Sequence, residues 1–156
     1  MDFTERQKLR QRYQNGHTAV VTSLAGITEV ELDERPAADA WTAREIVHHL
    51  ADSETNSYIR LRKLLAEDDA TLLAYDEAEW ARRLHYGRSI EPSLAVLKAV
   101  RDASAQLLDA LSPTDWERSG THPEHGLYSV DTWLEIYAAH AHDHAQQIQR
   151  ARKGVA

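Results

Sequence analysis

Four long stretches of this sequence carry apolar residues three or four positions apart, and this helical spacing constrains the fold more than any other feature. No stretch shows the sustained alternation of apolar and polar residues that marks a strand, so we expect no β-structure. The predicted fold is all-α, a four-helix bundle, with residues 1–156 forming a single domain. The long helices are predicted at about residues 4–26, 42–66, 89–111 and 129–152, with a short helix at about 77–84.

Local signals support two of these helix starts. Thr42 is followed three residues later by Glu45, which is the spacing of a capping box. Pro92 falls in the first turn of the third long helix, where a missing N–H is tolerated. The connector between the second and third long helices, residues 67–88, is long for a bundle, and it leaves the up-and-down order of the helices open.

Composition and charge exclude several classes of function. The formal net charge is −7, and the 18 lysine and arginine residues are scattered, so we expect no nucleic-acid partner. The chain has no cysteine, which excludes disulfides and cysteine-based metal sites and fits a cytoplasmic location. The first residues are charged and no apolar stretch approaches about 18 residues, so we expect neither a signal peptide nor a membrane association.

Three closely spaced histidines in the fourth long helix, His140, His142 and His144, are the strongest candidate functional residues. His140 and His144 are four residues apart, and both lie on one flank of the apolar stripe. His142 points in another direction and is expected to be solvated. Two imidazoles one helical turn apart can hold one metal ion between them.

The second long helix offers the third ligand. His49 begins a polar stripe beside the apolar one, and Ser53, Asn56 and Arg60 continue it. His48 is expected to lie further out, so we predict His49 as the ligand. Three histidines leave coordination positions open, which indicates chemistry at the metal, with Asn56 and Arg60 as candidate substrate contacts.

The ordinary alternative is a solvated helix surface, because most His-x3-His pairs on helices bind no metal. The other histidines are expected to be mostly exposed, including His17, His85, His122 and His125. A ferritin-like two-iron site would need a second Glu-x-x-His motif, which the sequence lacks. A hemerythrin-like oxygen carrier has metal ligands at similar helical spacing, but the other ligands that its two-iron site would need are not apparent in this sequence.

Several stretches together resemble the DinB/YfiT-like family of bacterial metal-binding four-helix proteins. They are WTAREIVHHLADSE at 41–54, NSYIR at 56–60, and three stretches similar to the YfiT branch, YDEAEW at 75–80, HPEHG at 122–126 and YAAHAHDHAQQI at 137–148. The resemblance covers about residues 25–152. It implies that His49, His140 and His144 bind one divalent ion per chain, typically zinc or nickel, in a bundle that often forms a homodimer. Glu54 and Gln147 stand where the family can have histidine, and neither change removes a ligand.

The resemblance also implies a function. Members of the YfiT branch act as metal-dependent hydrolases or as transferases that join a low-molecular-weight thiol, such as bacillithiol, to an electrophile. We therefore expect an enzyme acting on small molecules in stress or detoxification, in which the metal lowers the pKa of a thiol or a water. No protein general base is evident, so the catalytic residues are unknown. This gap favours the alternative of a non-catalytic metal-binding stress-response module.

Overall fold

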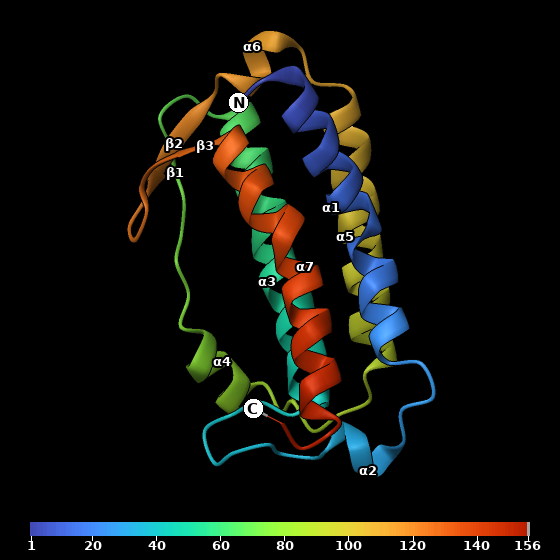
Figure 1. Ribbon diagram of the computed structural model, residues 1–156. Coiled ribbons are helices and arrows are strands. Elements are labelled where there is room, and N and C mark those ends of the chain that lie inside the picture. Colours follow the sequence, from blue (N-terminus) through green and yellow to red (C-terminus); the bar gives the residue numbers. More distant parts are fainter. Residues whose placement is uncertain (156) are drawn as a thin grey trace.

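The computed structural model describes residues 1–155, and four long helices dominate it (Figure 1). They are α1 (Phe3–Ser23), α3 (Ala43–Ala66), α5 (Glu91–Asp109) and α7 (Val130–Ala151). The four long helices predicted from apolar spacing all form, with ends that differ from the predicted ones by a few residues. The expected all-α four-helix bundle is confirmed.

The order of the helices departs from a simple up-and-down bundle. The helix α1 packs against α5 and α7, and α3 packs against the same two helices. Figure 1 shows that α1 and α7 run in one direction, whereas α3 and α5 run in the other. Two sequential helices can be parallel neighbours here because the connector between α3 and α5 returns along the side of the bundle. The connector is long because it must run back along the bundle from the end of α3 to the start of α5.

Short elements complete the chain. Three of them are the short helices α2 (Glu29–Leu32), α4 (Glu77–Arg83) and α6 (Pro113–Trp116). The other three are short strands, which form a minor addition to the all-α bundle and which the sequence did not indicate. The strands β1 (Ala70–Thr71), β2 (Ser119–His122) and β3 (Gly126–Ser129) form one sheet in the order β1-β2-β3. Strands this short carry too few residues for alternation to be visible in the sequence.

The sheet ties the connector to the end of the bundle. Strand β2 pairs in parallel with β1, and antiparallel with β3. Gly120 lies opposite Ala70, and a Cβ atom at position 120 would collide with the carbonyl oxygen of Ala70. Only glycine therefore allows this close approach of the two backbones. The pairing of β1 with β2 holds the β2–β3 hairpin next to α3.

The capping box predicted for the second long helix is present. The Thr42 side chain accepts a hydrogen bond from the Glu45 backbone N–H at 3.2 Å, and the Glu45 carboxylate accepts one from the Thr42 N–H at 2.9 Å. Two N–H groups at the start of α3 are thereby satisfied. This start fixes the phase of α3 two turns before His49.

The core consists of two clusters of buried apolar residues, stacked along the bundle. One includes Leu50 and Ile148, and the other includes Leu61, Trp133 and Leu134. Both clusters take residues from α3 and α7, so the seam between these two helices runs the length of the core. Side chains on the flank of this seam are held by rigid elements. Among the described residues, no helix combines the length and the apolar character needed to cross a membrane.

Candidate metal centre

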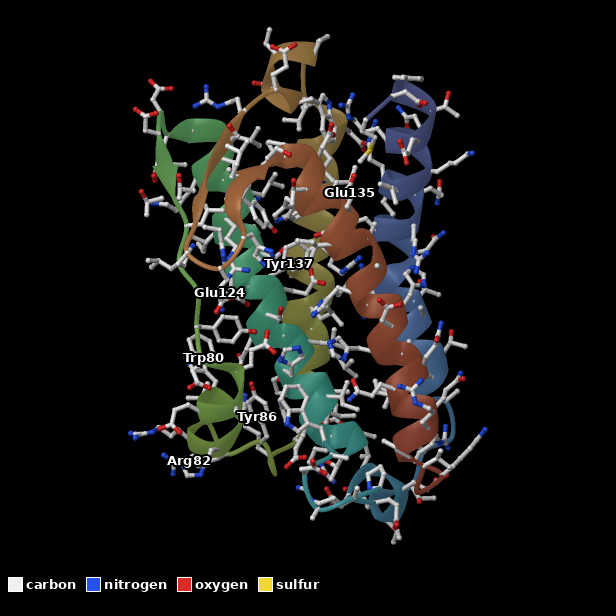
Figure 2. All side chains as sticks on the ribbon, turned by 60° about the vertical axis from the view of Figure 1, so that its left-hand side comes forward. Trp80, Arg82, Tyr86, Glu124, Glu135 and Tyr137 are labelled. Carbon is white, nitrogen blue, oxygen red and sulfur yellow. The ribbon has the colours of Figure 1, made fainter. Side chains whose placement is uncertain are left out.

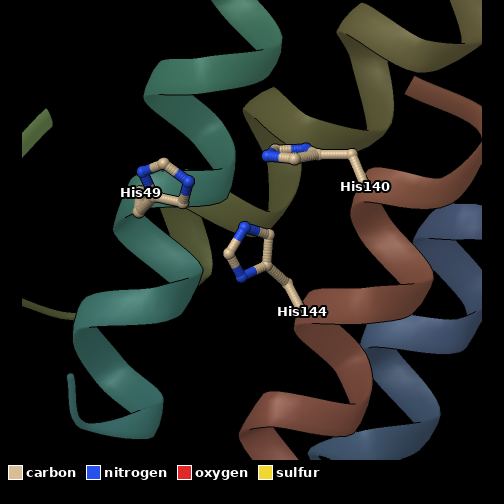
Figure 3. Close-up of side chains that lie close together, drawn as sticks. All are labelled: His49, His140 and His144. Atoms are coloured by element: carbon tan, nitrogen blue, oxygen red, sulfur yellow. The ribbon is translucent and has the colours of Figure 1, made fainter. Parts of the chain in front are cut away.

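His49 from α3 and His140 and His144 from α7 meet on one flank of the α3–α7 seam (Figure 3). Each of the three offers one ring nitrogen, and these nitrogen atoms all lie within 4.8 Å of one another. The ring centroids are 4.7 Å apart for His140 and His144 and 4.8 Å apart for His49 and His144. The three predicted ligands are therefore brought together in space, in a group that could hold one metal ion.

Hydrogen bonds fix the tautomers of the two α7 histidines. The Nδ1 atom of His144 lies 2.7 Å from Oε1 of Gln147, and Nδ1 of His140 lies 3.3 Å from Oε1 of Glu54. Both oxygen atoms are acceptors, so Nδ1 carries the proton in each ring. The Nε2 lone pairs are left facing the cluster, which is the arrangement that metal-binding histidines use.

Burial keeps two of the imidazoles neutral. His49 is 2% exposed, and burial together with the nearby His144 and His140 lowers its pKa to about 3. Burial and the nearby His140 lower the pKa of His144 to about 4. Neutral imidazoles have a free lone pair at neutral pH, so protons do not compete with a metal ion there. The half-buried Trp41 packs its ring 4.6 Å from that of His49 and covers it.

His142 lies apart from this cluster, as its helical phase predicts. Its Nε2 atom is 2.9 Å from the backbone oxygen of Arg12 on α1. The side chain is half-buried against α1 rather than fully solvated. His142 is therefore a suitable control for experiments on the three clustered histidines.

His48 also lies outside the cluster, but the expectation that it faces outward was wrong. It is 0% exposed, with Nδ1 2.8 Å from Oγ of Ser93 on α5 and Nε2 3.0 Å from the backbone oxygen of Arg88. Because α3 is covered by α5 on this side, a position beside the apolar stripe is buried rather than exposed. Both nitrogen atoms of His48 are occupied, which leaves His49 as the histidine of this pair that can take part in the cluster.

A buried ion pair between Glu54 and Arg101 lies next to the three clustered histidines and orients His140. Glu54 is 0% exposed, and its Oε1 atom accepts hydrogen bonds from both Arg101 and His140. Arg101 also donates to the backbone oxygens of Tyr13 and Tyr137. A buried charge pair of this kind holds its members in one geometry. His140 is thus oriented by a network that spans α1, α3, α5 and α7.

A polar cavity of about 150 Å³ adjoins His140. It lies between α3, α7, the connector and the β2–β3 hairpin, and Ser53, whose Oγ atom is 3.5 Å from Nε2 of His140, forms part of its wall. Figure 2 labels Tyr137 and Glu124, which line the cavity from α7 and from the hairpin. A small molecule in this cavity would lie against the open side of His140.

The two predicted substrate contacts lie in different surroundings. Arg60 lines the cavity beside His140 and also a second one of about 210 Å³. Asn56 lines only the second cavity, and its side chain donates to the backbone oxygen of Asp52 at 2.9 Å. None of the three clustered histidines lines that second cavity. The structure therefore places Arg60, but not Asn56, on the cavity that adjoins His140.

The sequence interpretation missed the hairpin side of the cavity. His122 was expected to be exposed, but it is 2% exposed and lines the cavity together with Tyr75 and Tyr128. His122, Glu124 and His125 form a second group with ligand atoms within 4.8 Å of one another. However, Nδ1 of His122 accepts a hydrogen bond from the Glu124 backbone N–H at 3.2 Å, so its Nε2 carries the proton and has no lone pair for a metal. The HPEHG and YDEAEW stretches, noted for their family resemblance, were the sequence signals for this wall.

Comparison with known proteins agrees with the fold. The model of the DinB superfamily matches residues 12–148 of this chain. The chain belongs to the DinB superfamily.

Solved structures and curated proteins with similar sequences support this assignment. YfiT from Bacillus subtilis, described as a probable metal-dependent hydrolase with an unusual four-helix bundle topology, superimposes with a TM-score of 0.90 at 28% identity, over 100% of this chain and 91% of YfiT. A protein of Oceanobacillus iheyensis named "putative metal-dependent hydrolase" is 42% identical over 76% of this chain and 69% of its own length. A protein of the same name from Halalkalibacterium halodurans is 30% identical over 80% of this chain and 73% of its own length.

Proposed function

We propose that this protein is a divalent-metal-dependent enzyme that acts on small molecules, with His49, His140 and His144 binding one ion per chain. The observation that carries the proposal is the convergence of three imidazoles whose free ring nitrogens face one another. The names of the relatives, which describe metal-dependent hydrolases, support the same reading.

The residues fit a metal of the zinc or nickel type. Imidazole is a preferred ligand of both ions, and three of them leave coordination positions free. The hydrogen bonds from His140 to Glu54 and from His144 to Gln147 would hold the rings in place before any ion arrives. A divalent ion at this position would supply a Lewis acid that lowers the pKa of a coordinated water or thiol.

The side chains around the three histidines would control access to the site and would position the substrate. Trp41 packs against the ring of His49, and the cavity beside Ser53 would give a substrate access to the cluster at His140. Arg60 and the tyrosines around the cavity would bind and orient the substrate. Either water or a thiol could be the nucleophile, so we propose a hydrolase or a transferase of a low-molecular-weight thiol such as bacillithiol.

Turnover with two reporter reactions tests this proposal. The metal-loaded protein is incubated with p-nitrophenyl esters, and separately with a panel of thiols and monochlorobimane. We expect one of the two reactions to exceed the metal-free control, to survive in His142→Ala and to be lost in His144→Ala. Tight metal binding with no turnover in either assay would favour the alternative, a non-catalytic metal-binding stress-response module.

Three further features belong to the same proposal. We propose a single domain over 1–156, because the family match spans residues 12–148 and the likeness to YfiT covers the whole chain. A homodimer follows from the family resemblance, and sedimentation analysis would test it. A cytoplasmic location is consistent with the absence of cysteine.

A further inference from the structure

The cavity beside His140 contains three polar atoms that have no partner within the protein. They are the hydroxyl oxygens of Tyr75 and Tyr128 and the Nε2 atom of His122, and all three residues line this one cavity. Tyr128 is 1% exposed. Buried polar groups normally find a hydrogen-bond partner, and leaving one unpaired destabilises the protein. Three such atoms on one wall therefore point to a ligand that supplies the missing partners.

The unpaired atoms are hydrogen-bond donors. Nε2 of His122 carries a proton because Nδ1 accepts from the Glu124 backbone N–H. Burial raises the pKa of Tyr75 and of Tyr128, so both hydroxyls keep their protons at neutral pH. The complementary ligand atom is therefore an acceptor, such as an oxygen.

A fixed positive charge stands beside these donors. Arg60 donates one hydrogen bond to the hydroxyl of Tyr137 at 2.9 Å and two to the backbone oxygen of Leu73, at 2.7 and 3.2 Å. Both acceptors are neutral, and Arg60 forms no ion pair among residues 1–155. A guanidinium has five N–H donors, so two of them remain free here. An acceptor that also carries negative charge would match this wall better than a neutral one.

We propose that this cavity binds a carboxylate group of the substrate, held by Arg60, His122, Tyr75 and Tyr128. Because Ser53 and His140 line the same cavity, the carboxylate would hold the substrate with its reacting end at the three histidines. This inference rests on the proposed function, because it names the class of substrate that the proposed enzyme would bind. Binding of a carboxylate by these four residues does not require a metal ion.

Two acidic residues limit where the carboxylate can sit. Glu77 and Glu124 also line the cavity, but both are exposed and stand at its solvent side. They would repel an anion at the mouth, whereas His122 and Tyr128 are buried. The carboxylate is therefore expected against the buried wall, and Glu124→Gln should strengthen its binding.

Binding of propionate and of propionamide to the metal-free protein tests the inference without reference to catalysis. The two probes have nearly the same shape, but only propionate is charged. The readout is the imidazole ¹⁵N signal of His122, assigned by its loss in His122→Asn. We expect propionate to shift this signal saturably and to bind about tenfold more tightly than propionamide, because hydrogen bonds to a charged acceptor are stronger than those to a neutral one.

Single substitutions distinguish an effect on carboxylate binding from an effect on folding. Arg60→Gln should abolish the preference for propionate. Tyr128→Phe should weaken propionate binding without lowering the stability of the free protein, because its hydroxyl has no partner to lose. Tyr58→Phe, a tyrosine outside the cavity, should behave as the wild type. Equal affinity for the two probes, or a preference that survives Arg60→Gln, would overturn the inference. Because no metal is present, such a failure would leave the metal proposal standing, and a failure of the metal proposal would leave this result unchanged.

Discussion

Gln147 lies one helical turn after His144, and its Oε1 atom accepts a hydrogen bond from Nδ1 of that histidine at 2.7 Å. This bond selects the tautomer that leaves Nε2 free and also fixes the plane of the ring. Gln147 is half-buried and belongs to neither core cluster. Its contribution to metal binding can therefore be measured apart from the fold.

Gln147→Ala should weaken metal affinity by about tenfold, since removing a residue that orients a ligand typically costs 10–100-fold. The exposed neighbour Gln146 gives a matched control, and Gln146→Ala should bind as the wild type does. Competition with a chelator of known affinity measures the change. Equal affinity in the two variants would show that Gln147 does not orient His144.

Glu54→Gln should destabilise the protein by about 3–5 kcal/mol, because it leaves the Arg101 charge buried without a partner. The double variant Glu54→Gln/Arg101→Met removes both charges and should recover much of this loss. Urea unfolding of the metal-free proteins measures both effects. A single variant within about 0.5 kcal/mol of the wild type would contradict a structural role for the pair.

Gly16→Ala should destabilise the protein by about 1–3 kcal/mol, although alanine is the better helix former. A Cβ atom at position 16 would lie 2.5 Å from Nη2 of Arg101 and 2.9 Å from Cβ of Ala141. The neighbouring exposed Asn15 serves as control, and Asn15→Ala should be neutral or slightly stabilising. Thermal unfolding compares the two. A rise in the melting temperature of Gly16→Ala would show that the helices α1 and α7 have room to separate.

The ion pair between Arg6 and Asp131 should make stability depend on pH in the acid range. Burial alone would raise the pKa of Asp131, but the hydrogen bonds from Arg6 at 2.8 Å, the charge of Arg6 and the ammonium group of Met1 together more than offset it, and the pKa is lowered. A carboxyl group with a lowered pKa in the folded state stabilises the fold above its unfolded pKa of about 3.9, and this contribution disappears as pH falls through the folded pKa. Asp131→Asn should therefore cost about 1 kcal/mol at pH 7 and almost nothing near pH 2. A loss in stability that is the same at both pH values would rule out this ion pair as its cause.

The long helices and the three clustered histidines could be predicted because they depend on local sequence. Helical spacing placed His140 and His144 on one flank, and the Thr42–Glu45 capping box fixed the phase that brings His49 toward them. These features need only the regular geometry of a helix.

The hairpin wall could not be predicted because it depends on contacts between distant segments. Ala70 pairs with Gly120 across fifty positions of sequence, and no local pattern marks either strand. The burial of His48 and His122 likewise follows from neighbours on other elements, α5 for one and the sheet for the other. Sequence reasoning therefore found the histidine cluster and Arg60, and missed the hairpin side of the cavity beside them.

The metal content of the purified protein tests the central proposal most directly. Inductively coupled plasma mass spectrometry is applied to the wild type and to His49→Ala, His140→Ala, His144→Ala and His142→Ala, all purified without chelators. We expect one divalent ion, zinc or nickel, per chain in the wild type and in His142→Ala, and little or none in the other three variants. A wild type without a stoichiometric ion, or a His142→Ala variant that loses the ion while His144→Ala keeps it, would contradict the proposed centre.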